Sequence, residues 1–184
     1  GSGLVGSEMC IRDRARAVRD TKIYYQSHPG GEYLWNAKPR FGKTLSVYDF
    51  CKQVDAQTVL IVTNRPAIAN SWYSDYVRFL GRESGYLFVS HVDALAGQPH
   101  VLDEQGYLDA AAQGEKLYKR IEFVSLQDMK GSKYFGGEYD KLRHLTELNW
   151  DVLVIDEAHE GVDTYKTDLA FERIRRKFTL HLSG

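Results

Sequence analysis

The fold is decided by the stretch Asn36-Ala37-Lys38-Pro39-Arg40-Phe41-Gly42-Lys43-Thr44, which joins an apolar run at 33–35 to an amphipathic segment at 45–54. Gly42 lets the backbone close around a phosphate, Lys43 offers a cation to the terminal phosphates, and the Thr44 hydroxyl can bind Mg²⁺. A helix that begins here adds the positive end of its dipole. The stretch therefore predicts a phosphate-binding loop between a strand and a helix.

This loop departs from the usual pattern, because Ala37 stands where glycine is common and residues 38–41 replace the usual glycine and serine. A second motif supports it. The stretch Asp151-Val152-Leu153-Val154-Ile155-Asp156-Glu157-Ala158-His159 has the pattern of a buried strand that ends in adjacent carboxylates. A phosphate-binding loop needs such an acid for its metal ion. The two motifs together indicate a nucleotide site far more specifically than either one alone.

The composition limits the classes of protein and partner. The 184 residues carry 24 Lys and Arg against 25 Asp and Glu, so there is no general basic field and any nucleic-acid site must be local. The two cysteines, Cys10 and Cys51, indicate neither a disulfide framework nor a zinc site, and Cys51 falls on the apolar side of a helix. No apolar run reaches about 18 residues, and no signal-peptide core is present. We therefore expect one domain in a cytoplasmic protein with no membrane partner.

Strand and helix patterns alternate along the chain, which predicts an α/β fold with a mostly parallel sheet. Residues 1–14 do not continue this pattern, and we expect a non-native segment that is disordered or forms a helical extension without core contacts. The aromatic residues Trp72, Tyr76 and Phe79 are expected in the core, and Asp151 is expected to be a solvated loop acid. Strands are expected at 32–37, 58–63, 86–90, 121–126, 151–155 and 178–182; helices at 15–25, 44–54, 64–80, 108–118, 139–148 and 164–175; and a surface loop at 91–106.

Two further segments complete a family resemblance. Residues 62–67 (Val-Thr-Asn-Arg-Pro-Ala) and 123–127 (Phe-Val-Ser-Leu-Gln) stand where superfamily 2 helicases contact a nucleic-acid strand, and the final Ser-Gly would open their Ser-Gly/Ala-Thr motif. With the phosphate loop and the Asp-Glu-Ala-His box, residues 15–184 resemble the first RecA-like domain of a DEAH-box helicase of this superfamily. The resemblance is strongest to the helicase domains of restriction enzymes and related mobile-element proteins. It implies a three-layer RecA-like P-loop NTPase domain, as a fragment truncated at the start of that last motif.

The resemblance also assigns roles to particular residues. Lys43 would bind the β- and γ-phosphates of ATP, Thr44 and Asp156 would hold Mg²⁺, and Glu157 would position or deprotonate the attacking water, so Lys43, Asp156 and Glu157 are the candidate catalytic residues. His159 would link the nucleotide site to nucleic acid. The remaining candidate nucleotide contacts are Ala37, Lys38, Pro39, Arg40, Phe41 and Gly42, and the candidate nucleic-acid contacts are Arg65, Pro66, Ser125 and Gln127.

The implied function is an ATP-driven helicase or translocase motor that moves on DNA in a restriction or defence system, with RNA left open as the other substrate. The implied partners are a missing second RecA-like domain, which supplies an arginine finger, and nuclease or methyltransferase modules. Without that finger the chain alone is expected to bind ATP and Mg²⁺ but hardly to hydrolyse ATP; the local candidates Arg173, Arg175 and Arg176 have the pattern of solvated residues. The alternative is a P-loop kinase or nucleotide-dependent switch, which would need no nucleic-acid contact from Arg65 or Gln127.

Overall fold

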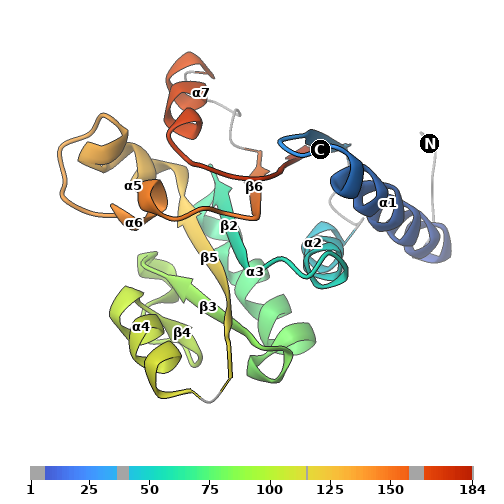
Figure 1. The fold of residues 1–184 in the computed structure, drawn as a ribbon, viewed down its shortest axis with the longest axis horizontal. Coiled ribbons are helices and arrows are strands. Elements are labelled where there is room, and N and C mark those ends of the chain that lie inside the picture. The colour runs from blue at the N-terminus through green and yellow to red at the C-terminus, as the bar shows by residue number, and fades with distance from the viewer. Residues whose placement is uncertain (1–6, 37–41, 115, 158–163, 184) are drawn as a thin grey trace.

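The computed structural model describes residues 7–36, 42–114, 116–157 and 164–183 (Figure 1). Within these residues, seven strands form one parallel sheet in the order β1-β7-β6-β2-β5-β3-β4. The strands are β1 (Glu32–Asn36), β2 (Thr58–Thr63), β3 (Tyr86–Ser90), β4 (Val101–Leu102), β5 (Lys119–Ser125), β6 (Val152–Asp156) and β7 (Thr179–Ser183). The helices are α1 (Ser7–Ser27), α2 (Lys43–Gln53), α3 (Ala69–Asp75), α4 (Glu104–Gln113), α5 (Leu126–Gly131), α6 (His144–Glu147) and α7 (Thr164–Glu172).

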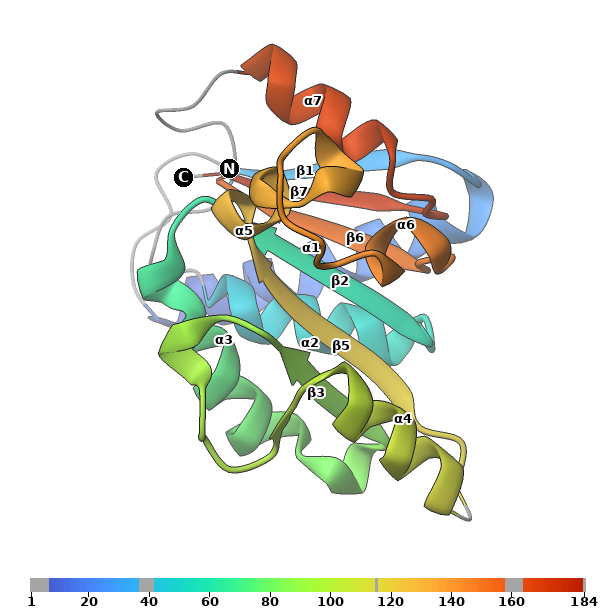
Figure 2. The same cartoon turned by 90° about the vertical axis from the view of Figure 1, so that its left-hand side faces the viewer.

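The sheet carries a layer of helices on each face (Figure 2). In β2, Val59 and Ile61 belong to one core cluster and Leu60 and Val62 to the other, because successive side chains of a strand point to opposite faces. Helices α1, α2 and α3 cover the first face, and α5, α6 and α7 cover the second. A strand buried on both sides explains why β2 is a continuous apolar run. The predicted three-layer α/β architecture is confirmed.

The long helix expected after β2 is broken into three pieces. A 3-10 turn, Pro66–Ile68, leads into α3, which continues as a π-helical turn, Tyr76–Leu80. Trp72 is fully buried as predicted, whereas Phe79 is 50% exposed. A π turn contains more residues than an α turn and so rotates the side chains that follow it. For that reason Leu80, rather than Phe79, reaches the core.

The surface loop expected at 91–106 contains the edge strand β4 and the start of α4. Asp103 caps α4 by accepting a hydrogen bond from the backbone N–H of Gly106 at 2.7 Å. This cap starts the helix at Glu104, before the expected start at residue 108, and the helix ends at Gln113, before the expected end at residue 118.

The helix expected at 139–148 is reduced to the four residues of α6. Leu142 has a left-handed backbone with a φ of 61°, and a right-handed helix cannot run through that conformation. The Ser132 hydroxyl holds the preceding loop by donating a hydrogen bond to the Lys141 carbonyl at 2.6 Å. Leu142 and Leu145 are nevertheless buried, so the apolar spacing marked core contacts without marking a helix.

Asp151 is not the solvated acid that the sequence predicts. Its side chain accepts a hydrogen bond from the backbone N–H of Gln57 at 2.7 Å and pairs with Lys177 at 3.2 Å. The residue is only 9% exposed. Asp151 therefore ties the chain before β6 to the segments that precede β2 and β7.

Helix α1 runs through part of the segment expected to be non-native, since it begins at Ser7. Arg14 belongs to that segment, and its guanidinium lies against Gly42 of the phosphate loop. The described part of this segment is helical, and its Arg14 meets the domain at Gly42 rather than in either core cluster. Residues 1–6 lie outside the described residues.

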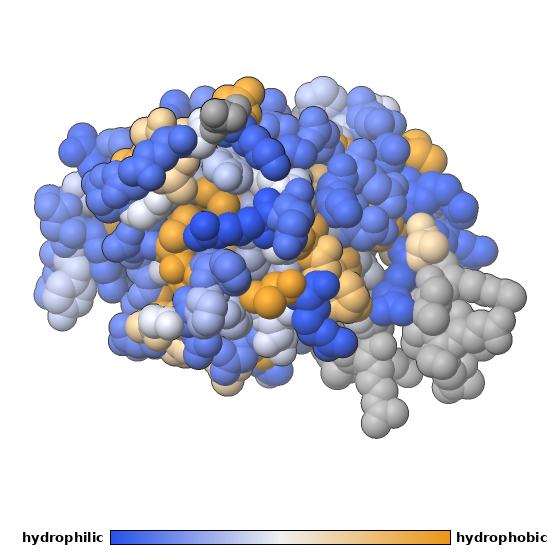
Figure 3. Space-filling model, turned by 90° about the horizontal axis from the view of Figure 1, so that it is seen from below, coloured by the Kyte–Doolittle hydropathy of each residue, from blue (hydrophilic) through white to orange (hydrophobic). Residues whose placement is uncertain are grey.

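The surface is mixed in character. On the face drawn in Figure 3, small groups of hydrophobic residues lie among hydrophilic side chains. Exposed large hydrophobic side chains occur on separate elements, such as Leu34 on β1 and Leu108 on α4, as is usual for a folded domain. In the part of the chain that the structure describes, no helix is both long and apolar enough to cross a membrane.

Candidate nucleotide-binding site

The parallel register brings the predicted motifs to one edge of the sheet. Asn36 at the end of β1 pairs with Ser183 on β7, and Asp156 at the end of β6 pairs with Thr63 at the end of β2. Thr63 pairs in turn with Ser125 at the end of β5. Ligands of open parallel sheets bind at the carboxyl ends of the strands. This edge carries the start of the predicted phosphate loop, the acidic motif and both predicted nucleic-acid segments.

Lys43, the first residue of α2, contacts both carboxylates of the acidic motif. Its Nζ donates a hydrogen bond to Asp156 Oδ1 at 3.0 Å and lies 3.6 Å from Glu157 Oε1. Its side chain is only 17% exposed, so Lys43 is largely enclosed within this site. The predicted phosphate-binding lysine and the predicted acids thus form one cluster.

Gly42 caps α2 in a left-handed conformation, with φ 74° and ψ 44°. A residue with a Cβ rarely adopts this conformation, and a Cβ here would also meet the guanidinium of Arg14. The hydroxyl of Ser46 donates to the Gly42 carbonyl at 3.1 Å, which closes the first turn of the helix. Glycine is therefore required at this position. The predicted site residues that lie outside the described residues are Ala37, Lys38, Pro39, Arg40, Phe41 and His159.

Helix α3 supplies two residues that the sequence did not assign to the site. Trp72 Nε1 donates a hydrogen bond to Asp156 Oδ2 at 3.2 Å, and Asp75 accepts one from the Thr44 hydroxyl. Residues three apart lie on the same face of a helix, so α3 connects the acidic strand to the phosphate loop. The one available signal was that a buried indole N–H usually needs a partner. No spacing rule could have named Asp156 as that partner.

Burial raises the pKa of Asp156, whose side chain is fully enclosed. The hydrogen bond and charge of Lys43 and the hydrogen bond from Trp72 act in the opposite direction, and the charge of Glu157 adds to the rise. Since burial is the larger effect, the ionised carboxylate is less stable in the folded chain than in water. A second cation at this site would stabilise it.

Glu157 follows β6 with a left-handed backbone, at a φ of 52°. Such conformations are uncommon for residues other than glycine and concentrate at functional sites. One carboxylate oxygen lies 3.2 Å from Arg65 Nη1, and the two side chains are 12% and 48% exposed respectively. Thr63 supports both neighbours, because its hydroxyl donates to the Asp156 carbonyl and accepts from the Arg65 N–H, each at 3.1 Å. The predicted nucleic-acid contact Arg65 therefore reaches a predicted catalytic acid.

The other predicted nucleic-acid contacts differ in exposure. Ser125 is 4% exposed and caps α5 by accepting a hydrogen bond from the Asp128 N–H at 3.1 Å. Gln127, in the first turn of α5, is exposed. Pro66 begins the 3-10 turn that follows Arg65. Ser125 thus positions the turn from which Gln127 projects.

A lysine that contacts two carboxylates at the carboxyl edge of a parallel sheet is the arrangement expected of a P-loop ATPase, and the fold is that of a RecA-like core. Residues 17–184 match the family described as type III restriction enzyme, res subunit, and the chain belongs to this family. The resemblance to helicase domains of restriction enzymes is confirmed.

A curated relative is also described as a restriction enzyme. The chain is 28% identical over 172 residues to the C-terminus of a proposed type II restriction enzyme and methyltransferase from Mycoplasma pneumoniae. The alignment covers 90% of this chain but 22% of that protein, so the chain spans about a fifth of the relative's length.

Solved structures share the fold at low sequence identity. The SWI2/SNF2 ATPase core of Sulfolobus solfataricus gives a TM-score of 0.61 at 17% identity, over 93% of this chain and 30% of that one. The same core in complex with double-stranded DNA gives a TM-score of 0.60 at 15% identity, over 93% of this chain and 31% of that one. A third structure is a nuclease-deletion mutant of the type ISP restriction-modification enzyme LlaGI in complex with a DNA substrate mimic. It gives a TM-score of 0.56 at 13% identity, over 92% of this chain and 17% of that one. These similarities confirm the RecA-like fold.

Proposed function

We propose that this chain is the ATP-binding motor core of a helicase or translocase that moves on DNA in a restriction system. The contact of Lys43 with Asp156 and Glu157 carries the proposal, because it joins a phosphate-binding cation to the acids that hydrolysis needs. Membership of the restriction-subunit family supports nucleotide use, and the two DNA-bound structural relatives support DNA as the substrate.

The residues at this edge suit Mg²⁺ and ATP. Thr44 and Asp156 offer oxygen donors, which Mg²⁺ prefers, and a cation would offset the burial of Asp156. Because the Thr44 hydroxyl donates its hydrogen bond to Asp75, the lone pairs of its oxygen can coordinate the metal ion. The bound ion would neutralise phosphate charge. Lys43 would exchange its contacts with the two carboxylates for phosphate oxygens.

Glu157 suits the role of orienting and deprotonating the attacking water. Lys43 and Arg65 each contact its carboxylate, one at each oxygen. When phosphate oxygens bind Lys43 and a nucleic-acid phosphate binds Arg65, both contacts are released and the carboxylate can turn to the water. This exchange would couple the DNA strand to hydrolysis through one arginine.

In this function, residues 15–184 would form one RecA-like domain of a larger protein. A second RecA-like domain would complete the motor, and nuclease or methyltransferase modules would act with it. The relative described as a restriction enzyme and methyltransferase supports such an arrangement. So does the restriction-modification enzyme among the structural relatives.

The Lys43→Ala variant tests the nucleotide site. The change removes a charge-assisted contact worth about 1.5–3 kcal/mol, so calorimetry should find Mg²⁺·ATP binding at least about tenfold weaker. Lys52→Ala is the matched control, because Lys52 is an exposed lysine in the last turn of the same helix. Circular dichroism would check that both variants remain folded. Equal ATP affinity in Lys43→Ala and the parent would refute the assignment.

Salt dependence tests the nucleic-acid surface. A chain with a net charge of −1 should neutralise few phosphates, so log K against log salt should have a slope of about −2 to −3. Arg65→Ala should weaken DNA binding and make that slope shallower by about 1. Arg143→Ala is the control, since Arg143 is an exposed arginine of the chain before α6.

A slope near about −8, or no response to Arg65→Ala, would place the DNA surface elsewhere. The same titrations address the alternative function. A kinase or nucleotide switch would bind ATP through the same loop but would show no DNA binding that depends on Arg65.

A further inference from the structure

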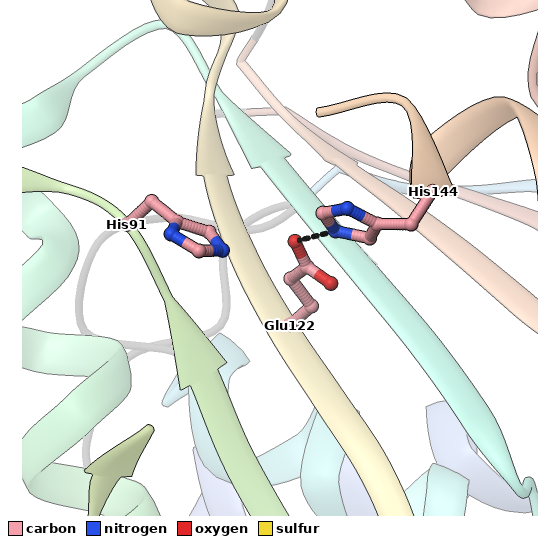
Figure 4. A group of neighbouring side chains, drawn as sticks. All are labelled: His91, Glu122 and His144. Carbon is pink, nitrogen blue, oxygen red and sulfur yellow. Dashed lines mark hydrogen bonds and ion pairs between the residues drawn. The ribbon is translucent and has the colours of Figure 1, made fainter. Parts of the chain in front are cut away.

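Three titratable side chains outside the nucleotide site meet between β3, β5 and α6. His91 follows the last residue of β3, Glu122 lies within β5, and His144 is the first residue of α6 (Figure 4). One ligand atom from each lies within 4.8 Å of the other two. The two imidazole rings flank the carboxylate, with their centroids 6.0 Å apart.

We propose that His91, Glu122 and His144 form a binding site for a zinc ion. Two imidazoles and one carboxylate are an established donor set for Zn²⁺. With bonds of about 2.0–2.2 Å, the ligand atoms of a tetrahedral zinc lie about 3.3 Å apart. His144 Nε2 and Glu122 Oε2 are 2.7 Å apart, and the third ligand atom is within 4.8 Å. His91 is exposed, so a modest change of its rotamer can close the site.

The surroundings favour a cation. A pocket of about 520 Å³ beside the two histidines is lined by the carboxylates of Asp93, Glu104 and Asp128 against one lysine, Lys141. Glu104 Oε2, which also accepts a hydrogen bond from Arg120, lies 3.7 Å from His144 Nε2 and would be the fourth donor atom. The pocket also gives the ion a path from solvent.

The buried Arg120 does not block the site. Its Nε donates a hydrogen bond to Glu122 Oε1 at 3.1 Å, whereas His144 meets Oε2. Zinc would take the place of the proton between His144 and Oε2 and leave Oε1 to the arginine. A hydrogen bond to the oxygen that does not bind the metal fixes the orientation of the carboxylate.

The ion would be structural, because it would connect the end of β3, the middle of β5 and the start of α6. Such a connection braces the second nucleic-acid segment, whose Ser125 ends β5. An ion that binds only the folded chain raises the melting temperature. The expected rise is about 5–10 °C at a free zinc concentration of about 100 times Kd.

Calorimetric titration of the chain with Zn²⁺ tests the proposal. The Cys10→Ser background removes a thiol that could compete for zinc, and excess Mg²⁺ occupies the nucleotide-site acids. His91→Asn is expected to weaken zinc binding by at least about 10-fold. Because His91 is exposed, the variant should melt like its parent without metal. His100→Asn changes another exposed histidine that does not line the pocket, and should bind zinc like the parent.

A parent that binds one zinc ion with an elevated melting temperature, together with a His91→Asn variant that loses both, would support the site. Equal zinc affinity in the parent and His91→Asn would overturn it. So would the absence of saturable zinc binding to the parent. Neither result would affect the nucleotide site, because ATP binding and Lys43→Ala are measured independently.

Discussion

Arg120→Ala is expected to lower the free energy of unfolding by about 3–5 kcal/mol, because it removes one partner of a buried ion pair. The Arg120 side chain is 2% exposed and contacts Glu122, which is fully buried, and Glu104. Alanine would leave the carboxylate of Glu122 enclosed without its arginine.

The charge on Glu122 makes this loss severe. Burial opposes its ionisation, but the hydrogen bond from His144 and the charges of Arg120 and His144 outweigh burial and lower the pKa of Glu122. The carboxylate is therefore ionised at neutral pH. Once Arg120 is removed, the folded state must hold that charge with less compensation or take up a proton.

Thermal and urea unfolding would measure the effect, and a fall in melting temperature of about 6–20 °C is expected. Arg143→Ala is the matched control, because Arg143 and Glu147 form an exposed i,i+4 pair. Such exposed pairs contribute about 0.3–0.5 kcal/mol to the free energy of unfolding. Adding Glu122→Gln to Arg120→Ala should recover part of the loss by removing the buried charge. Equal effects of the two arginine substitutions would contradict the proposed role of Arg120.

Very slow ATP hydrolysis is the second expected result: the 184-residue chain should bind Mg²⁺·ATP but turn it over at less than about 1 per second, even with DNA. Phosphoryl transfer needs a cation that neutralises the charge developing on the γ-phosphate. An arginine finger contributes about 10³- to 10⁵-fold to that step. In superfamily 2 helicases, which the chain resembles, the finger comes from the second RecA-like domain.

The arginines of this chain that were considered as possible arginine fingers lie away from the carboxyl edge of the sheet, where the nucleotide would bind. Arg175 and Arg176 precede β7, on the amino side of the strands, where Arg175 donates to the Glu147 carbonyl and Arg176 to the Ile174 carbonyl. Arg173 donates to the carbonyl of Tyr134 at 2.7 Å. The nucleotide would bind at the carboxyl edge, so these three side chains are directed to structural contacts elsewhere.

Steady-state phosphate release with and without DNA would measure the rate. Glu157→Gln is the control, because it removes the base and keeps a side chain of similar shape. Stimulated turnover above about 1 per second that Glu157→Gln abolishes would show that a finger is supplied within this chain or by a second copy of it. Addition of a second RecA-like domain should accelerate the reaction by about 10³-fold or more.

The central strands were predicted well because their burial on both faces requires continuous apolar runs in the sequence. The apolar runs that became β2 and β6 are enclosed on both faces, and only a central strand of a parallel sheet requires such a run. Helix boundaries were predicted less well. A local cap at Asp103 starts α4 earlier than expected, and a left-handed Leu142 removes most of the helix expected at 139–148. Such features depend on one hydrogen bond or one torsion angle, which a periodic pattern does not contain.

The sequence by itself determined the α/β class and the chemical groups of the nucleotide site: a phosphate-loop lysine and threonine, and adjacent acids at a strand end. Only the tertiary structure decided the partners of these groups. Trp72 binds Asp156, Asp75 binds Thr44 and Arg65 holds Glu157. The physical reason is the strand order, in which β6 and β2 are neighbours although β3, β4 and β5 separate them in the chain. Contacts between residues that are distant in sequence follow from that order and from parallel register, neither of which a local pattern of residues specifies.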